Sequence, residues 1–144
     1  MKNKYLILLF CTFLCVTSNI NANEITFDSD VINILNNGNK IVASKGIARS
    51  ADANIEIEAD LFNYDRNLSI LIATGNVVVK ELTNNILLKS DQIFYNIKNK
   101  KIESKINSEI EDELGNLFLS KNFIFTLSDN LIKFNDVKLI DIQN

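Results

Sequence analysis

Carboxylates are the side chains of this chain whose spacing could support chemistry. Asp30, Asp60 and Asp91 recur at intervals of about 31 residues, and an acidic run follows at Glu109–Glu113. Carboxylates held in an array can bind a cation or transfer a proton. However, the chain has no histidine, and both cysteines lie close to the N-terminus, so the usual general base and the commonest metal ligands are missing. The acidic run also lacks the glycine and ligand spacing of a calcium loop. We therefore predict no catalytic residue, no metal site and no cofactor, and we expect that the protein is not an enzyme.

The first 22 residues have the pattern of a secretory signal peptide. Met1–Lys4 carry two lysines, Tyr5–Val16 are almost wholly apolar, and Thr17–Ala22 are small or polar, with a plausible cleavage site after Ala22. A membrane anchor is the alternative, but twelve apolar residues span only about 18 Å as a helix, against a hydrocarbon core of about 30 Å. We expect export to the periplasm and a mature domain at residues 23–144 that contains no cysteine.

The charged residues give no sign of a nucleic-acid partner. The formal net charge is −3, and charges of both signs are scattered along the chain. The single local basic cluster comprises Lys98, Lys100, Lys101 and Lys105, and a solvated turn explains it better than a phosphate-binding stripe does.

A repeat of about 31 residues organises the chain. "IEIEADLFNYD" from Ile55 aligns with "ILLKSDQIFYN" from Ile86 and "LFLSKNFIFTL" from Leu117. Apolar residues recur at every second position within a unit, and turns rich in Asn, Asp and Gly separate the runs, so each unit is predicted to be two β-strands. A helix is the competing interpretation at Ser104–Leu114, and the repeat alignment favours strand there. The expected fold is all-β: a repeat-built β-jelly roll of roughly eight to ten strands in two facing sheets.

The parity of the apolar positions changes once in each unit, at the aspartate column. Ile57 and Ala59 have odd numbers, whereas Phe62 and Tyr64 have even numbers. A one-residue slip would expose half of a straight strand's apolar side chains, and a bulge or bend returns them to one interior. We therefore predict that the aspartates mark corners, with Asn122 in the same column.

Small residues recur at positions predicted to face the interior. Either they leave room for a lipid chain or they allow tighter local packing, and the pattern alone does not decide between the two. These residues are Ala43, Ala59, Ala73, Ser90, Ser104 and Ser108.

Two segments, "EADLFNYDRNLSILIATGNVVVKE" and "KSDQIFYNIKNKKI", resemble the OstA-like repeat of lipopolysaccharide transport proteins. The family pattern is an Ala-Asp, a Tyr four residues on, and an Ala-x-Gly-Asn-Val that opens the next strand. The best copy matches at Ala59, Asp60, Tyr64, Ala73, Gly75, Asn76 and Val77. The next copy keeps Asp91 and Tyr95 but has Ile106, Asn107 and Ser108 in place of Gly-Asn-Val.

The resemblance implies a jelly roll whose interior carries the acyl chains of lipid A, and hence lipopolysaccharide as ligand. It also implies edge-to-edge pairing with other jelly-roll proteins of the transport bridge. Two kinds of member fit: a free-standing periplasmic bridge protein (LptA-like), or the N-terminal domain of the outer-membrane assembly protein (LptD-like), which adds an outer-membrane barrel and its plug lipoprotein as partners. The last copy, from Glu113, favours the LptD-like form, in which case the chain is a fragment of an outer-membrane-associated protein. A purely structural β-repeat protein with a solid core is the alternative from another class.

The interior columns are predicted to contact the acyl chains. They are led by Ile57, Phe62, Tyr64, Leu71, Ala73, Val77, Val79, Leu88, Ile93 and Tyr95. Asp60, Gly75, Asn76 and Asp91 carry the family motif. The open edges are expected at residues 25–35 and 131–142, where another jelly roll could add a strand.

Overall fold

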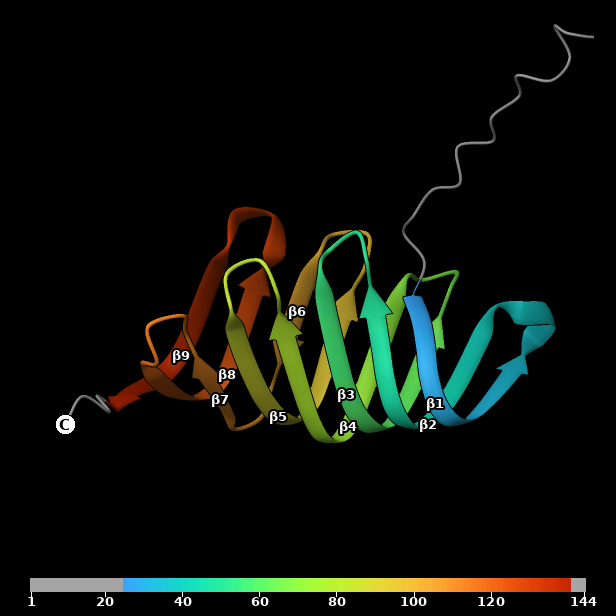
Figure 1. Cartoon of the computed structure of the whole chain (residues 1–144), viewed down its shortest axis with the longest axis horizontal. Helices are drawn as coiled ribbons and strands as arrows, with labels where there is room; N and C mark the ends of the chain where they lie inside the picture. The colour runs from blue at the N-terminus through green and yellow to red at the C-terminus, as the bar shows by residue number, and fades with distance from the viewer. Residues whose placement is uncertain (1–24, 141–144) are drawn as a thin grey trace, which may run out of the picture.

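The computed structural model describes residues 25–140, which form an all-β domain, and the predicted signal peptide lies outside these residues (Figure 1). No helix in this part of the chain is long and apolar enough to cross a membrane. The elements are β1 (Ile25–Leu35), the 3-10 turn η2 (Asn36–Gly38), β2 (Lys40–Ser50), β3 (Ile55–Asp65), β4 (Ile70–Glu81), β5 (Ile86–Asn96), β6 (Lys101–Ser104), β7 (Ser108–Glu111), β8 (Leu117–Thr126), the 3-10 turn η3 (Leu127–Asp129) and β9 (Leu131–Ile140).

The strands form one antiparallel sheet, and every strand pairs with its neighbours in the chain except that β6 and β7 do not pair with each other. β6 and β7 together occupy the place of one long strand, because both pair with β5 on one side and with β8 on the other. The strand interpretation of Ser104–Leu114 is confirmed at Ser104 and at Ser108–Glu111, whereas residues 105–107 form a break and residues 112–114 begin a turn. β1 and β9 are the two edges of the sheet in the described part of the chain.

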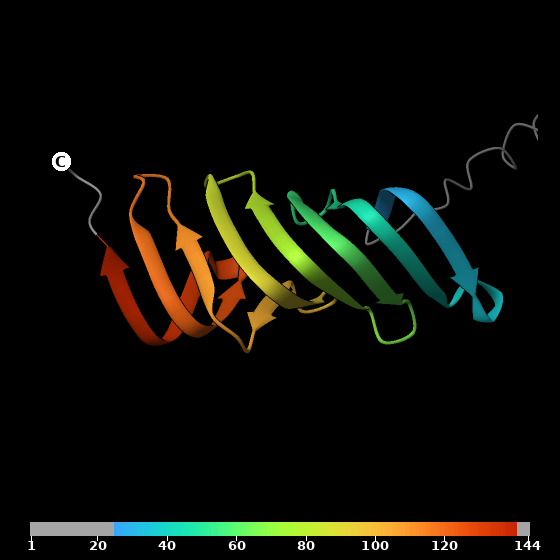
Figure 2. The same ribbon diagram turned by 90° about the horizontal axis from the view of Figure 1, so that it is seen from below.

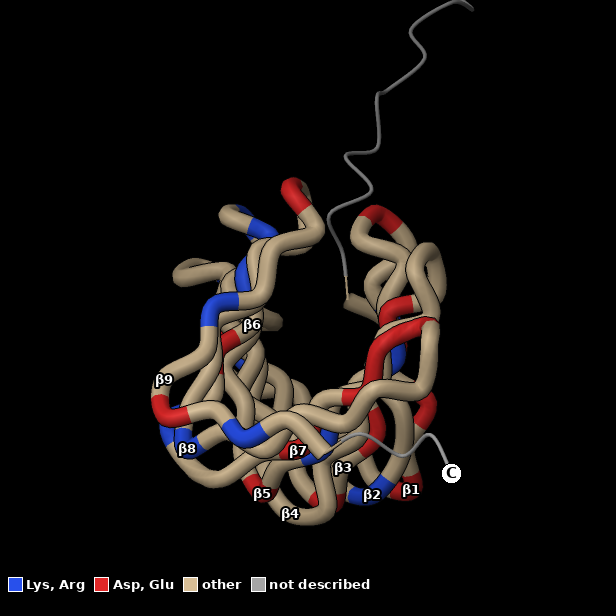
Figure 3. Tube along the Cα trace, turned by 90° about the vertical axis from the view of Figure 1, so that its left-hand side faces the viewer, with Lys and Arg blue, Asp and Glu red and all other residues tan. Residues whose placement is uncertain are grey.

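The sheet is folded into a U, and each long strand crosses the bend (Figures 1 and 3). The predicted all-β fold with two facing layers is confirmed, and the layers are the arms of a single sheet, because the ten- to twelve-residue strands bend from one arm into the other. The first arm contains residues 25–29, 46–50, 55–58, 77–81, 86–90, 108–111, 117–120 and 137–140. The second arm contains residues 31–35, 40–44, 61–65, 70–74, 92–96, 101–104, 123–126 and 131–135. Figure 2 shows the strands lying side by side along the length of the U.

The bend is built by local irregularities at the predicted corners. The register of β3 against β4 shifts between Glu58 and Leu61, around Asp60, and Asn76 on β4 has a left-handed backbone with φ of 47°. A bulge of this kind bends a strand and reverses the parity of its side chains. The aspartate column, in which the repeat alignment placed Asn122, differs from the prediction in β8. Asn122 pairs with Asn135, and Lys121 stands at the bend of β8 instead.

The core lies on the inner face of the U. Its largest fully buried side chains include Tyr95, Phe62, Phe123 and Phe125. Burying an aromatic or large aliphatic side chain contributes roughly 1.5–3 kcal/mol, so this face supplies most of the stability. Rings also meet from opposite arms. Phe27 contacts Phe62 at 5.7 Å between ring centroids.

The apolar inner face continues to both edges and is exposed there. Ile32 and Ile34 on β1 lie opposite the buried Ala43 and Ile41, yet they are 43% and 66% exposed. These two isoleucines face inward as the repeat pattern indicates, and they are exposed because no further strand of the described residues lies beyond β1, the expected open edge. Val137 and Leu139 on β9 are 50% and 56% exposed at the other edge.

Candidate lipid-binding interior

The ten residues predicted to contact acyl chains all lie on the inner face, and none is more than 6% exposed. Nine of them form three rows across β3, β4 and β5. The rows are Ile57–Val79–Leu88, Phe62–Ala73–Ile93 and Tyr64–Leu71–Tyr95, and the tenth residue, Val77, lies opposite Ser90. Their contact with lipid stays a prediction.

Several inner-face residues of the C-terminal strands were missing from the predicted set. Phe123 and Phe125 on β8, Ile102 on β6 and Ile110 on β7 are at most 1% exposed. The alternation in "NFIFT" signals both phenylalanines, but the last repeat is too degenerate to show where its strand bends. The lining of the interior therefore runs further along the U than the family motif does.

Side chains fill the space between the arms. Phe62 lies between Ala43 on β2 and Ala73 on β4, and all three are 0% exposed, so the alanines make room for the ring. Alternation of large and small residues on facing positions is how cores reach close packing. A surface pocket of about 680 Å³ is lined mainly by residues at the bend and on the outward-facing side of the first arm, including Lys89, Glu109 and Lys138. An acyl chain that binds between the arms must therefore move them apart.

Three serines close the bend at the break between β6 and β7. The hydroxyls of Ser90, Ser104 and Ser108 lie 3.0 Å from one another, and Ser108 also lies 2.9 Å from the main-chain carbonyl of Ile106. Buried hydroxyls need such partners, because an unpaired one costs free energy. These small residues serve local packing and do not leave open room.

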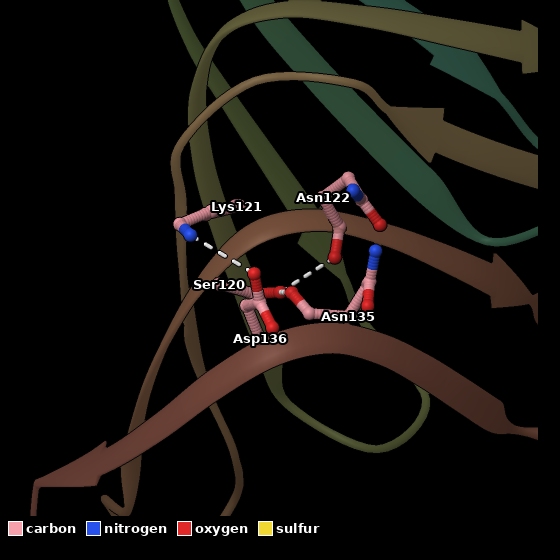
Figure 4. A network of polar contacts seen from close by, with 5 residues as sticks. All are labelled: Ser120, Lys121, Asn122, Asn135 and Asp136. Atoms are coloured by element: carbon pink, nitrogen blue, oxygen red, sulfur yellow. Dashed lines mark hydrogen bonds and ion pairs between the residues drawn. The ribbon is translucent and has the colours of Figure 1, made fainter.

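A similar arrangement ties β8 to β9 at the bend (Figure 4). The hydroxyl of Ser120 lies within hydrogen-bond distance of the main-chain carbonyls of Asn122 and Asn135. Lys121 and Asp136 form an ion pair at 2.9 Å beside it. The serine contact is shared with Ser90, whose hydroxyl donates to the carbonyl of Gln92, whereas the ion pair is particular to the last hairpin.

The motif residues Asp60, Gly75 and Asn76 meet at the corner between β3 and β4. The Asn76 amide donates to the Asp60 carboxylate at 2.8 Å. Gly75 has φ of +81°, and a Cβ there would lie 2.6 Å from Asp60 Oδ2. These contacts show that the three motif residues together form the corner between β3 and β4. Asp91 is exposed at the next corner, where Gly-Asn is absent. No group of acidic side chains in the described residues could hold a metal ion.

Two ionisable groups on the inner face have shifted pKa values. Burial raises the pKa of Tyr95, whose hydroxyl lies 3.3 Å from Ser50 Oγ on the opposite arm. Burial alone would also raise the pKa of Glu81, but hydrogen bonds from Asn84 and Thr83 lower it overall. Glu81 therefore remains charged and holds the turn that follows β4.

The two arms carry opposite charge (Figure 3). Acidic residues outnumber basic ones on the first arm and its turns, and basic residues outnumber acidic ones on the second. The first arm has Asp28, Asp52, Glu56, Glu58, Glu81, Glu109, Glu111, Asp112 and Glu113 against Arg49, Lys80, Lys89 and Lys138. The second arm has Lys40, Arg66, Lys98, Lys100, Lys101 and Lys133 against Asp65, Glu103 and Asp129.

A single folded antiparallel sheet with an apolar inner face is the architecture of the LptA-like β-jelly roll. The sequence matches no protein-family model and no curated protein. The fold is similar to a solved structure of LptH, the LptA homologous periplasmic component of the lipopolysaccharide transport device from Pseudomonas aeruginosa. The TM-score is 0.71 at 9% identity, and the match covers 82% of this chain and 94% of that one.

Proposed function

We propose that this protein is a periplasmic module of lipopolysaccharide transport that holds the acyl chains of lipid A against the inner face of its U. The observation that carries the proposal is the continuous apolar inner face, which runs along the whole sheet and ends exposed at Ile32, Ile34, Val137 and Leu139. A solid-core repeat protein would gain by covering those ends with polar residues. The fold shared with LptH supports the same role.

The free-standing, LptA-like form is the better supported of the two family forms. Residues 113–144 favour the LptD-like form on sequence, but the structural match spans nearly the whole of an LptA homologue. Immunoblotting of the host's periplasmic and outer-membrane fractions tests the choice. A soluble band of the size that this chain encodes supports the bridge form, whereas a much larger outer-membrane band supports the LptD-like form, with its barrel and plug lipoprotein.

Lipid binding is tested by photo-crosslinking at neighbouring positions of opposite parity. A photoreactive residue in place of Phe62, Val77 or Ile93 should capture lipopolysaccharide, because these side chains face inward. The matched controls, Asn63 and Gln92, are less buried neighbours and should not capture it. Equal labelling at both parities contradicts the assignment.

A structural β-repeat protein is the second candidate, and the filled interior favours it. Mass spectrometry of the protein purified from a lipopolysaccharide-producing host separates the two functions. Co-purified lipid A supports transport. A lipid-free protein that also takes up no labelled lipid A supports the structural role.

The open edges define how such modules join. β9 runs from the second arm to the first and β1 runs from the first to the second, so β9 of one module can pair antiparallel with β1 of the next. We propose the register that aligns the bends, with Asp30 opposite Asp136. It extends the apolar inner face, because Ile32 then faces Phe134 and Ile34 faces Ile132. The partner is a jelly roll of the same transport system, including a second copy of this chain.

Charge reversal tests this register. It places Asp28 of one module opposite Lys138 of the next, and both side chains are exposed. Asp28→Lys should weaken association in sedimentation experiments, and adding Lys138→Asp should restore it, because opposite charges facing each other across strands are favourable. If the double variant associates no better than the single one, the register is wrong.

A further inference from the structure

Two turns meet across the mouth of the U. The β2–β3 turn belongs to the first arm and the β5–β6 turn belongs to the second. Lys100 Nζ lies 3.0 Å from Asp52 Oδ2 and 3.4 Å from the main-chain carbonyl of Asp52. Lys100 is also fixed by its own backbone, because its carbonyl accepts a hydrogen bond from the Leu127 N–H at 2.9 Å.

This ion pair is less exposed than the pair at the bend of the last hairpin. The side chains of Lys100 and Asp52 are 38% and 34% exposed, against 69% and 62% for Lys121 and Asp136. Screening by water and salt is weaker for a partly buried pair than for an exposed one. The Asp52–Lys100 pair is therefore the stronger of the two. It joins the two arms, whereas the Lys121–Asp136 pair joins two neighbouring strands.

The interior lies directly below this pair. Tyr95, five residues before Lys100, hydrogen-bonds across the arms to Ser50, which lies two residues before Asp52. The negative charge of Asp52 also adds to the effect of burial that raises the pKa of Tyr95. An amphiphile that inserts a chain at this point must first part Asp52 from Lys100. Its headgroup then lies beside Lys100 and the exposed Lys98 on the basic arm.

We propose that Asp52 and Lys100 form a latch over the mouth of the U, and that the phosphate of an anionic amphiphile opens it by replacing Asp52 as the partner of Lys100. This inference rests on the proposed function and names its headgroup site. A phosphate monoester carries more charge than a carboxylate and presents three acceptor oxygens, so it can displace the carboxylate once a chain begins to separate the arms. Asp52 occupies the phosphate position in the closed state.

Opening is measured by pulsed dipolar spectroscopy on the full chain. Spin labels are placed at Ala51→Cys and Asn99→Cys, one on each turn, with Cys11 and Cys15 replaced by serine. The distance between the labels should lengthen with dodecyl phosphate. It should stay unchanged with dodecyl maltoside or with inorganic phosphate at the same concentration. A control pair at Ala51→Cys and Leu82→Cys, both on the first arm, should not respond. Opening by inorganic phosphate alone, or no opening by dodecyl phosphate, overturns the proposal.

Binding affinities give the second test. Lys100→Gln should weaken dodecyl phosphate binding about tenfold, because a charge-assisted hydrogen bond is lost. Asp52→Asn should strengthen it, because the competitor for Lys100 is weakened. Lys40→Gln removes an ion pair between neighbouring strands of one arm and should change nothing. General damage to the fold would weaken binding in both latch variants, so equal losses in Lys100→Gln and Asp52→Asn refute the latch. Dodecyl phosphate is not lipopolysaccharide, so a latch that opens in a protein that binds no lipid A would refute the proposed function and leave the latch standing.

Discussion

Replacing Gly75 by alanine should lower the stability of the domain by more than the cost of holding alanine in a left-handed backbone conformation. Gly75 and Gly115 both have φ of +81°, so alanine at either site incurs the same left-handed strain, roughly 1–2 kcal/mol. A Cβ at Gly75 would also lie 2.6 Å from Asp60 Oδ2, whereas a Cβ at Gly115 meets nothing within 4 Å. Asp60 must rotate away and lose its hydrogen bond from Asn76, which costs roughly a further 1 kcal/mol at this exposed position.

Urea unfolding followed by circular dichroism measures both losses. Gly75→Ala should lower the free energy of unfolding by roughly 2–3 kcal/mol and Gly115→Ala by roughly 1–2 kcal/mol, with similar m-values. Asp60→Ala removes the obstructing carboxylate but keeps Cβ, which lies 3.0 Å from the added methyl, so Gly75→Ala in that background should cost less than in the wild type and somewhat more than Gly115→Ala. Equal losses for the two glycines in the wild-type background would refute the reasoning, because the contact with Asp60 would then have no cost.

Three further perturbations test other parts of the structure. Tyr95→Phe should lower stability by about 1 kcal/mol and Ser50→Ala by a similar amount, with the double variant losing less than the sum, since one buried hydrogen bond joins them; additive losses in thermal unfolding would contradict this contact. The pKa of Glu81 is lower in the folded state, so its stabilisation is present above the unfolded pKa and is lost as the pH falls through the folded pKa. The wild type should therefore lose more stability than Glu81→Gln during acid titration, and parallel curves would refute this. Asp30→Asn should tighten association between modules, because the proposed register sets Asp30 against Asp136 and like charges opposite each other repel; unchanged or weaker association in sedimentation would argue against it.

The hairpins, their inward columns and the corner at Asp60 could be predicted because they follow from short-range periodicity. Strand parity assigns each side chain to a face, and the change of parity places the bulge. The same reasoning gives the inward direction of Ile32 and Ile34 but not their exposed fractions, because a repeat describes every unit as if it had neighbours on both sides. It also misplaced the bend of β8, where Lys121 replaces Asn122, because the last copy keeps only its apolar skeleton.

Contacts between the arms could not be predicted from the sequence. Asp52 and Lys100 belong to different repeat units, and their meeting depends on how sharply the sheet folds. The opposite charge of the arms is also not visible in the sequence, because each long strand contributes residues to both arms. The small interior residues were open to two interpretations, and the packing of Ala43 and Ala73 around Phe62, together with the contacts among Ser90, Ser104 and Ser108, favours close packing over a preformed chamber.

Because every strand pairs only with strands next or next but one in the chain, no hairpin depends on a distant segment for its backbone hydrogen bonds. The energetics of such a molecule are a sum over adjacent units, as in other repeat proteins. An in-frame duplication of one hairpin would add two strands, or roughly 10 Å of length, and would present the same inward columns to its neighbours. Deletion of one hairpin would shorten the molecule by the same step and leave the remaining pairings intact. Genes of this kind can therefore adjust the reach of their product by tandem duplication, without redesigning the core.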